Sequence, residues 1–252
     1  MSQILIEKDE RSLLVGTVNQ LIVYPVKSFA GRRVDRAFVG PHGIEGDRRC
    51  GFQRVSQNGR PKWLSARRCP QLLLYKTDAA VDDPHSQRII VTTPDGQVLD
   101  VASEALREDV SRRVGEQVEL VELENGCHDT VEVSLMTTGS LRTISSRIGQ
   151  DVDSRRFRVN IVVNAYRDDP FPEDAWVGGS LLIGSNDRPA RLRARERDSV
   201  CTMLNLDPDT AAKDPQVLDA ILEERRKAVG IYAAVESRGV IAVGNEVRLL
   251  KG

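Results

Sequence analysis

The sequence is poor in the residues from which metal centres and catalytic triads are usually built. Its 252 residues include three histidines and four cysteines. The cysteines, Cys50, Cys69, Cys127 and Cys201, are widely spaced, and none forms the CxxC pair of a zinc or redox site. These shortages argue against a histidine-based metal centre, a catalytic triad and a disulfide-stabilised secreted scaffold. They favour a reducing, cytoplasmic compartment.

Long apolar runs and nucleotide-binding loops are also lacking. Charged residues at positions 7–11 interrupt the apolar residues near the start of the chain. We therefore expect neither a secretion signal nor a membrane span. No GxxxxGK[ST] loop is present, and no GxGxxG precedes a helical pattern, which argues against enzymes that use a nucleotide cofactor.

Aromatic residues make up only 4% of the chain. The net charge is −1, yet residues 24–68 contain eleven Lys or Arg against three acidic residues, a local balance of +8. A nucleic-acid-binding β-barrel is one alternative, but single-strand binders stack bases on exposed rings, and this segment has few. The segment is instead suited to a smaller anion, or it is an ordinary solvated basic face.

The hydrophobic pattern predicts a β-rich α+β fold. Short apolar stretches rich in β-branched residues recur in both halves, for example at residues 13–26, 72–75 and 180–183. Helical spacing appears at residues 102–114, 141–148 and from Pro215 onwards, each after a capping residue. Antiparallel, barrel-like sheets with a few helices follow from this pattern, and a polar stretch suggests a domain boundary near residue 125.

Basic residues stand at two places where a phosphate could bind. Lys27 and Ser28 end an apolar strand, and Arg48 follows a glycine-containing turn. Such residues donate hydrogen bonds to phosphate oxygens, but they are also common at ordinary strand ends. If residues 155–160 continue the strand that follows, Arg156, Arg158 and Asn160 share one face, which would be either a binding surface or a solvated edge.

Cys201 is the cysteine whose surroundings suggest reactivity. It follows a strand and is flanked by Ser199, Val200 and Thr202, with several arginines before it. Nearby cations and hydroxyls favour a thiolate, which metal ligation or nucleophilic attack requires. The alternative is that Cys201 only fills space. Cys127 and His128 have no companion ligands, and we interpret them, with Cys50 and Cys69, as structural.

Six segments in this order resemble the MOSC proteins with an N-terminal β-barrel domain, the group that includes the mitochondrial amidoxime-reducing component and its bacterial relatives. They are YPVKS at 24–28, GIEGDRR at 43–49, LSAR at 64–67, RFRVNIVV at 156–163, EDAW at 173–176 and CTMLNLDPDT at 201–210. The resemblance implies an N-terminal β-barrel domain at residues 1–124 and a MOSC β-barrel domain with a few helices at residues 125–252.

The same resemblance implies a molybdenum cofactor between the two domains, with Cys201 as the metal ligand. Lys27, Ser28 and Arg48 would hold the pterin phosphate, and Tyr232 would close the far side. The pterin would be surrounded by Thr138, Gly139, Ser140, Arg158, Asn160, Ser199 and Val200. Val200 departs from the arginine of the eukaryotic relatives, although its backbone N–H could still donate to the phosphate.

The implied activity is the two-electron reduction of N-hydroxylated or N-oxide-type compounds. Electrons would come from a separate ferredoxin-like or cytochrome b5-like protein with its reductase. Loss of oxygen as water needs protons, so Asp174 or Asp209 is the candidate carboxylate. The alternative is a molybdenum-cofactor or sulfur carrier, in which Cys201 holds a persulfide. Neither nucleic acid nor a membrane is expected as a partner.

Overall fold

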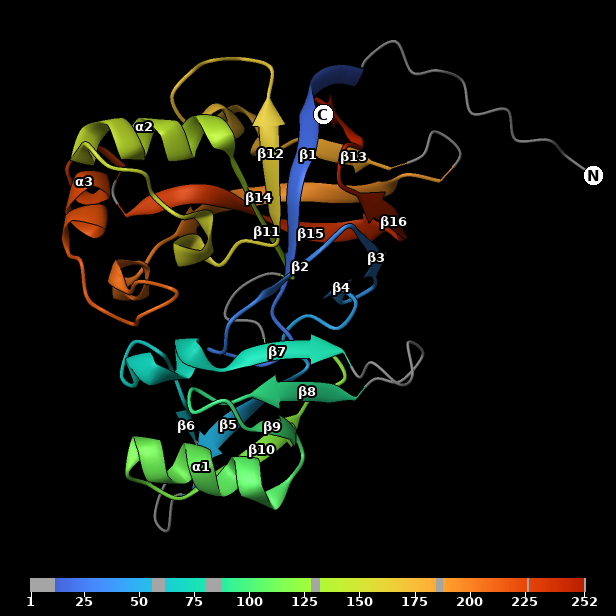
Figure 1. The fold of residues 1–252 in the computed structure, drawn as a ribbon. Coiled ribbons are helices and arrows are strands. Elements are labelled where there is room, and N and C mark those ends of the chain that lie inside the picture. The colour runs from blue at the N-terminus through green and yellow to red at the C-terminus, as the bar shows by residue number, and fades with distance from the viewer. Residues whose placement is uncertain are drawn as a thin grey trace, which may run out of the picture.

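The chain forms two lobes that are stacked one on the other in the computed structural model (Figure 1). The structure describes residues 12–55, 62–79, 88–127, 132–184, 188–225 and 227–251. The barrel lobe, at the top of Figure 1, contains β1, β11–β15 and β17 together with α2 and α3. The N-terminal lobe below it contains β5–β10 and α1.

The barrel lobe is built around a closed barrel of seven strands. The hydrogen-bonded order is β12-β11-β15-β14-β13-β17-β1, and pairing of β1 with β12 closes the circle. A closed sheet leaves no unpaired edge, and its inward-facing side chains fill the interior. The strands are β1 (Ser12–Val23), β11 (Val133–Thr137), β12 (Ile161–Ala165), β13 (Ser180–Ile183), β14 (Ala190–Ser199), β15 (Ala228–Ser237) and β17 (Glu246–Leu250).

Smaller elements extend this barrel. β2 (Arg32–Val34) pairs with the end of β1. A separate three-stranded sheet, β16-β3-β4, contributes buried side chains to the barrel core. Its strands are β3 (Arg36–Gly40), β4 (Gly43–Ile44) and β16 (Gly239–Ala242). The helices α2 (Thr138–Ile148) and α3 (Gln216–Arg225) form a second apolar cluster with residues of β11, β12 and β15.

The N-terminal lobe has a hydrophobic core of its own, formed by two small antiparallel sheets and one helix. One sheet contains β5 (Cys50–Arg54), β6 (Lys62–Trp63) and β10 (Val118–Glu122). The other contains β7 (Lys76–Ala79), β8 (Ile89–Thr92) and β9 (Val98–Asp100). The helix α1 (Glu104–Val114) begins where the Ser103 hydroxyl accepts a hydrogen bond from the Leu106 amide, and it ends at the left-handed Gly115.

The predicted β-rich fold and the three predicted helices are confirmed, but two local predictions were wrong. Residues 72–75 do not form a strand: residues 72–74 belong to a 3₁₀ helix, η1 (Pro70–Leu74), and Tyr75 is its C-cap. Proline at its start fixes a helical φ, and the turn buries Leu72 and Leu73. Such a short apolar run has no periodicity that separates a strand from a buried turn.

Residues 155–160 also differ from the predicted extended strand. Residues Ser154–Phe157 form a 3₁₀ turn, η2, which the Asp153 carboxylate caps by accepting from the Arg155 amide at 2.8 Å. Arg158 then adopts a left-handed conformation. Arg156, Arg158 and Asn160 therefore do not share the face of one strand.

The first strand of the chain lies in the barrel of the C-terminal half. β1 pairs with β12 on one side and β17 on the other. Whether the chain divides into domains at residues 124 and 125 stays a prediction. The hydrogen bonding shows that residues 12–23 complete the barrel whose other strands come from residues 133–250.

Candidate functional site

A cavity of about 430 Å³ lies between the two lobes. This volume is within the range of small-molecule and cofactor sites. The N-terminal side is lined by Lys27, Ser28, Arg48, Trp63, Ser65 and Arg67. The barrel side is lined by Ser134, Tyr232, Arg156, Phe157, Arg158, Met203 and Leu204, and by the consecutive residues Asp198, Ser199, Val200 and Cys201.

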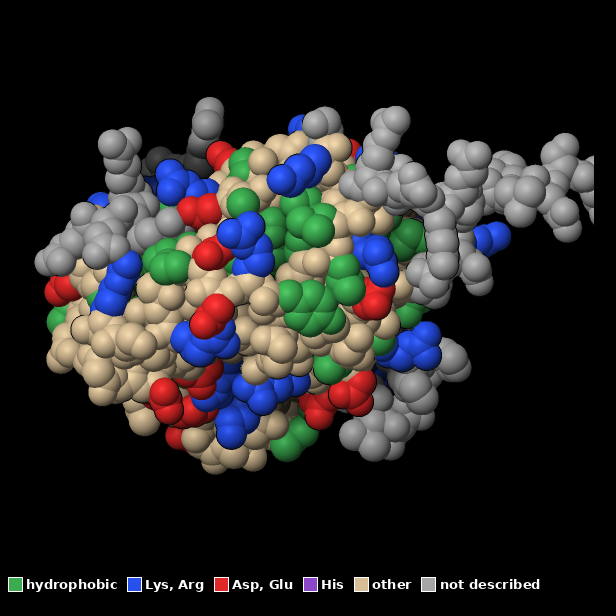
Figure 2. Space-filling view, turned by 90° about the horizontal axis from the view of Figure 1, so that it is seen from above, with side chains coloured by type: hydrophobic (Ala, Val, Ile, Leu, Met, Phe, Trp, Pro, Cys, Tyr) green, Lys and Arg blue, Asp and Glu red, His purple; other side chains and the backbone are tan. Residues whose placement is uncertain are grey.

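The cavity wall is strongly basic. It contains the side chains of one lysine and four arginines, together with one acidic residue, Asp198. By contrast, the end of the barrel lobe that faces away from the N-terminal lobe carries cations, anions and exposed apolar side chains intermixed (Figure 2). Positive charge enclosed by low-dielectric walls attracts anions more strongly than the same charge on an open surface. The cavity is therefore the part of the fold suited to an anionic ligand.

Three residues of the cavity wall have a strained backbone. Ser28, Arg48 and Arg158 have φ values of 71°, 49° and 55°. Among the described residues other than glycine, only three more have a positive φ: Phe171, Ala211 and Lys227. This region is costly for residues with a Cβ, and it persists where surrounding contacts impose it, often at functional sites. Half of these strained positions line one cavity.

Hydrogen bonds fix the basic side chains in place. Lys27 Nζ donates to the carbonyl of Cys127 at 3.1 Å. Arg48 is paired with Asp47, and its Nη2 donates to the carbonyl of Arg158 at 2.9 Å. Arg158, which is 8% exposed, donates from Nη1 to the carbonyl of Phe29 at 2.8 Å. The bonds that involve Arg158 join it to the segments of Arg48 and Phe29, which lie far from it in the chain.

A buried tyrosine, Tyr24, lies behind the two arginines. The guanidinium carbon of Arg158 is 4.3 Å from the ring centroid, and that of Arg48 is 5.0 Å from it. Burial raises the pKa of Tyr24 to about 12, and the two guanidinium charges act in the opposite direction. The phenol is therefore neutral near neutral pH, and its ring is available for cation–π contacts with both arginines.

Cys201 has the exposed thiol among the four cysteines, since Cys50 and Cys127 are buried and Cys69 is half-buried. It lies between the end of β14 and the short 3₁₀ helix η4 (Thr202–Asn205). Burial raises the pKa of Cys50 to about 12, which makes that thiol inert. Cys201 is thus the cysteine that a ligand in the cavity can reach.

The loop after Cys201 is held by both lobes. Leu204 packs with the cluster of α2 and α3, whereas Leu206, which is 3% exposed, packs in the core of the N-terminal lobe. Arg156 pairs with Asp207 at 3.3 Å, and Arg155 pairs with Asp209 at 2.6 Å. These contacts fix the position of Cys201 at the junction between the lobes.

Eight of the residues predicted from the sequence line the cavity: Lys27, Ser28, Arg48, Arg158, Ser199, Val200, Cys201 and Tyr232. One detail differs from the expectation. The backbone N–H of Val200 donates to the carbonyl of Lys227 at 2.7 Å, because this segment pairs with the start of β15. A bond from this amide to a phosphate stays a prediction, and it would compete with this contact.

Six predicted residues lie outside this cavity wall, and their roles stay predictions. Asn160 is buried, where it accepts from the Ser134 amide and donates to the carbonyl of Ile22, both at 3.2 Å. Asp174 lies 3.8 Å from Arg197, and Asp209 pairs with Arg155. The other three begin α2, where Thr138 donates to Asn164 and Ser140 to Glu173, next to Gly139.

The sequence did not single out several cavity residues. Ser65 and Arg67 belong to the LSAR segment, so the motif could have indicated them. Phe157 lies in the RFRVNIVV segment, and Met203 and Leu204 lie in the CTMLNLDPDT segment, so these motifs could have indicated them as well. Trp63, Ser134 and Asp198 carry no local signal, because they are brought together from separate elements. Arg156 was considered only as part of a strand that does not form.

Glu173, next to the start of α2, is a fully buried carboxyl group. It accepts hydrogen bonds from the hydroxyls of Ser140 at 2.5 Å and Thr137 at 2.7 Å. Burial raises its pKa above the ordinary value of 4.5, although both hydroxyls act in the opposite direction. Because the pKa of Glu173 is higher in the folded protein than in the unfolded chain, protonation of Glu173 stabilises the fold. This contribution to stability is fully present below pH 4.5, and it is lost as the pH rises through the raised pKa.

We expect Glu173→Gln to remove this pH dependence. The free energy of unfolding of the wild type, minus that of the variant, should fall as pH rises from 4.5 towards neutrality. The glutamine side chain has one acceptor oxygen fewer than the glutamate side chain. The loss of that acceptor costs about 1 kcal/mol at any pH. Urea unfolding followed through the fluorescence of the buried Trp176 measures the difference. A difference that is constant with pH would show that Glu173 does not titrate in this range.

The closed barrel, the second lobe and the basic cavity at their junction define a two-lobed β-barrel protein with a ligand site between the lobes. The chain belongs to the MOSC family: the MOSC domain matches residues 122–248, and the MOSC N-terminal beta barrel domain matches residues 15–139. The family predicted from the six segments is confirmed.

Curated relatives cover most of the chain at low identity. The chain is 27% identical to mitochondrial amidoxime reducing component 2 of Bos taurus and of Homo sapiens over 288 residues, 92% of this chain and 83% of each relative. It is 26% identical to component 1 of Mus musculus, covering 94% of this chain and 83% of the relative. The crystal structure of the YUAD protein from Bacillus subtilis has a TM-score of 0.50 and 15% identity, covering 94% and 96% of the two chains, and shows the same fold.

Proposed function

We propose that this protein binds a molybdenum cofactor in the cavity between its lobes and reduces N-hydroxylated or N-oxide-type compounds by two electrons. The observation that carries the proposal is that the exposed Cys201 and the basic residues Lys27, Arg48 and Arg158 line one cavity. The names of the relatives support the reaction class, because an amidoxime is an N-hydroxylated compound.

The residues present fit such a cofactor. Thiolate sulfur is a soft ligand suited to molybdenum, and a cationic wall suits a pterin phosphate. No group of three or more His, Cys, Asp or Glu side chains that could hold a metal ion occurs in the described ranges. This donor set is consistent with a site in which one cysteine ligates the metal and the cofactor itself supplies the other ligands. When bound, the cofactor would supply the two-electron redox chemistry.

Within this proposal each side chain has a definite task. Cys201 would ligate the metal, and Lys27, Ser28, Arg48 and Arg158 would hold the phosphate. Ser199, Val200 and Tyr232 would contact the pterin. The proton that leaves with the substrate oxygen needs a nearby acid.

Asp198 is the carboxyl group that lines the described part of the cavity, so we place the proton transfer on it first. Asp174 and Asp209, which were predicted from the sequence, are the alternatives. The Arg155 guanidinium holds the pKa of Asp209 below its ordinary value, so Asp209 stays ionised near neutral pH. A carboxylate in this state accepts a proton less readily than one with a raised pKa.

The proposal includes a separate electron donor. A ferredoxin-like or cytochrome b5-like protein with its reductase would supply the electrons in the cytoplasm. Among the described helices, none has both the length and the apolar character that a membrane crossing requires.

The experiment is a metal, pterin and sulfur analysis of the wild-type chain, purified from a host that makes the cofactor. We expect near-stoichiometric molybdenum and pterin, and reduction of benzamidoxime with a chemically reduced viologen as donor. A protein with neither metal nor pterin, but with labile sulfane sulfur on Cys201, would contradict the proposal and would indicate the sulfur carrier instead. Cofactor without reduction would indicate a cofactor carrier.

A further inference from the structure

Tyr24 lies behind the basic wall of the cavity and contacts both arginines of that wall. We propose that Tyr24 is a positioning residue, which aligns the guanidinium groups of Arg48 and Arg158 for an anionic group in the cavity. The inference rests on the proposed function, in which that anionic group is the cofactor phosphate. Tyr24 itself does not line the main cavity, so it would act on the ligand through the two arginines.

Hydrogen bonds fix both the ring and the backbone of Tyr24, and its phenol O–H donates to the carbonyl of Val159 at 3.4 Å. Its backbone N–H donates to Asp47 Oδ1 at 2.7 Å, and Asp47 is also the ion-pair partner of Arg48. Its carbonyl accepts from the Arg48 amide at 2.7 Å, which holds Arg48 in its left-handed conformation. Tyr24 thus contacts both the backbone and the side chain of Arg48.

The flat ring adds a contact of a different kind to these hydrogen bonds. Arg48 donates to Asp47 and to the carbonyl of Arg158, and Arg158 donates to the carbonyl of Phe29. Contact with an aromatic face at 5.0 Å and 4.3 Å further restricts how the two guanidinium groups can turn, and it is attractive for both cations. Cation–π contacts are strongest where water is excluded, and Tyr24 is 1% exposed.

The sequence makes room for the ring at Gly31. A Cβ at this position would lie 2.4 Å and 2.6 Å from Cε1 and Cδ1 of Tyr24, and 2.8 Å from Cγ2 of Ile22, all closer than real Cβ contacts. Gly31 is not among the residues with a positive φ, so its backbone would accept alanine. Its lack of a side chain therefore serves the position of the Tyr24 ring.

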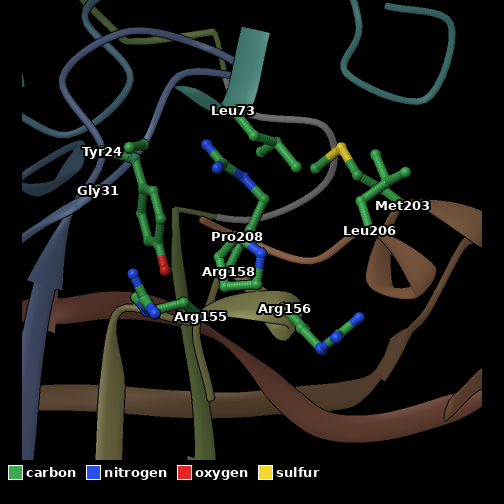
Figure 3. Close-up of a pocket in the computed structure, with 10 residues that line it drawn as sticks. Tyr24, Gly31, Leu73, Arg155, Arg156, Arg158, Met203, Leu206 and Pro208 are labelled. Atoms are coloured by element: carbon green, nitrogen blue, oxygen red, sulfur yellow. The ribbon is translucent and has the colours of Figure 1, made fainter. Parts of the chain in front are cut away.

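A second, small cavity shows what a smaller side chain would permit. It has about 30 Å³, roughly room for a single water molecule, and is lined by Tyr24, Gly31, Leu73 and Arg158 among others (Figure 3). Arg158 borders this space as well as the main cavity. Loss of the ring would enlarge the space behind Arg158 and let its guanidinium move away from the main cavity.

The test is the affinity of the full chain without cofactor for inorganic phosphate, measured by titration calorimetry at constant ionic strength. Trp63 lines the cavity, so its fluorescence gives a second reading. We expect Tyr24→Leu to bind phosphate roughly tenfold more weakly than the wild type, and Tyr24→Phe to bind almost normally because it keeps the ring. Gly31→Ala should weaken binding although the tyrosine is retained, because the ring must shift.

Tyr75 provides the matched control. It is a buried tyrosine of the N-terminal lobe with Arg113 over its ring at 5.9 Å, and its hydroxyl donates to Asp109 at 2.5 Å. Tyr75→Leu should lower stability without changing phosphate affinity. Adding Gly31→Ala to Tyr24→Leu should weaken binding no further, because no ring remains to be displaced.

Two results would overturn the inference. Equal phosphate affinity in the wild type and Tyr24→Leu would show that the arginines need no alignment by the ring. A wild type that binds no phosphate would show that the arginines are not an anion site. Metal and pterin content of the wild type is measured independently, so it separates failure of the proposed function from failure of the role of Tyr24.

Discussion

The Cys201→Ala variant is expected to purify with at least tenfold less molybdenum than the wild type, from the same cofactor-producing host. Loss of a residue that only orients a ligand typically costs about 10- to 100-fold in metal affinity, and loss of the ligand itself costs no less. The protein should stay folded, because the Cys201 side chain is exposed and no core residue depends on it. Elemental analysis of the purified chains measures the change.

Cys69 provides the control for this experiment. It is a half-buried thiol of the N-terminal lobe that donates to Gln71 Oε1 at 3.4 Å and does not line the cavity. Cys69→Ala should keep its molybdenum, and iodoacetamide should label Cys201 in protein without cofactor but not in loaded protein. Equal molybdenum in Cys201→Ala and wild type would exclude this thiol as the ligand.

The Leu206→Ala variant is expected to lose about 2–5 kcal/mol of unfolding free energy, the usual cost of truncating a buried leucine. Leu206 is 3% exposed and packs in the core of the N-terminal lobe, although it directly follows η4, the 3₁₀ helix that comes after the barrel strand β14. Its truncation should also loosen the contact between the lobes. Urea unfolding should then give separate transitions, since Trp63 reports on the N-terminal lobe and Trp176 on the barrel core.

An exposed leucine serves as the comparison. Leu13 in β1 is 53% exposed, and Leu13→Ala should change stability by less than about 0.5 kcal/mol. Coincident transitions at both tryptophans in Leu206→Ala, with unchanged midpoint, would mean that the loop after Cys201 does not hold the lobes together.

Local patterns were sufficient for elements whose signals lie within a few residues. The helix α1 has its cap at Ser103 and its stop at Gly115, both next to the apolar repeat, and β13 coincides with residues 180–183 as predicted. The patterns failed at residues 72–75 and 155–160. A proline begins the first of these 3₁₀ turns, and an aspartate caps the second. A pattern of only a few apolar or alternating residues does not distinguish such a turn from a strand.

Prediction of the site depended on motifs rather than on periodicity. YPVKS and GIEGDRR indicated Lys27, Ser28 and Arg48, and the structure places all three with Cys201 at one cavity. Trp63, Ser134 and Asp198 line the same cavity without belonging to the predicted set. Their proximity results from pairing between strands far apart in the chain, which has no local signature.

The sequence by itself determined the β-rich composition, the concentration of cations at residues 24–68, the single reactive-looking cysteine and the family. The tertiary structure decided how these meet. Pairing of β1 with β12 closes the barrel and brings Tyr24 next to Arg158. The left-handed backbone of Arg48 depends on a hydrogen bond to Tyr24, and its side chain is held by the carbonyl of Arg158, 110 residues away in the chain. Such conformations are unfavourable locally, so only long-range contacts can select them.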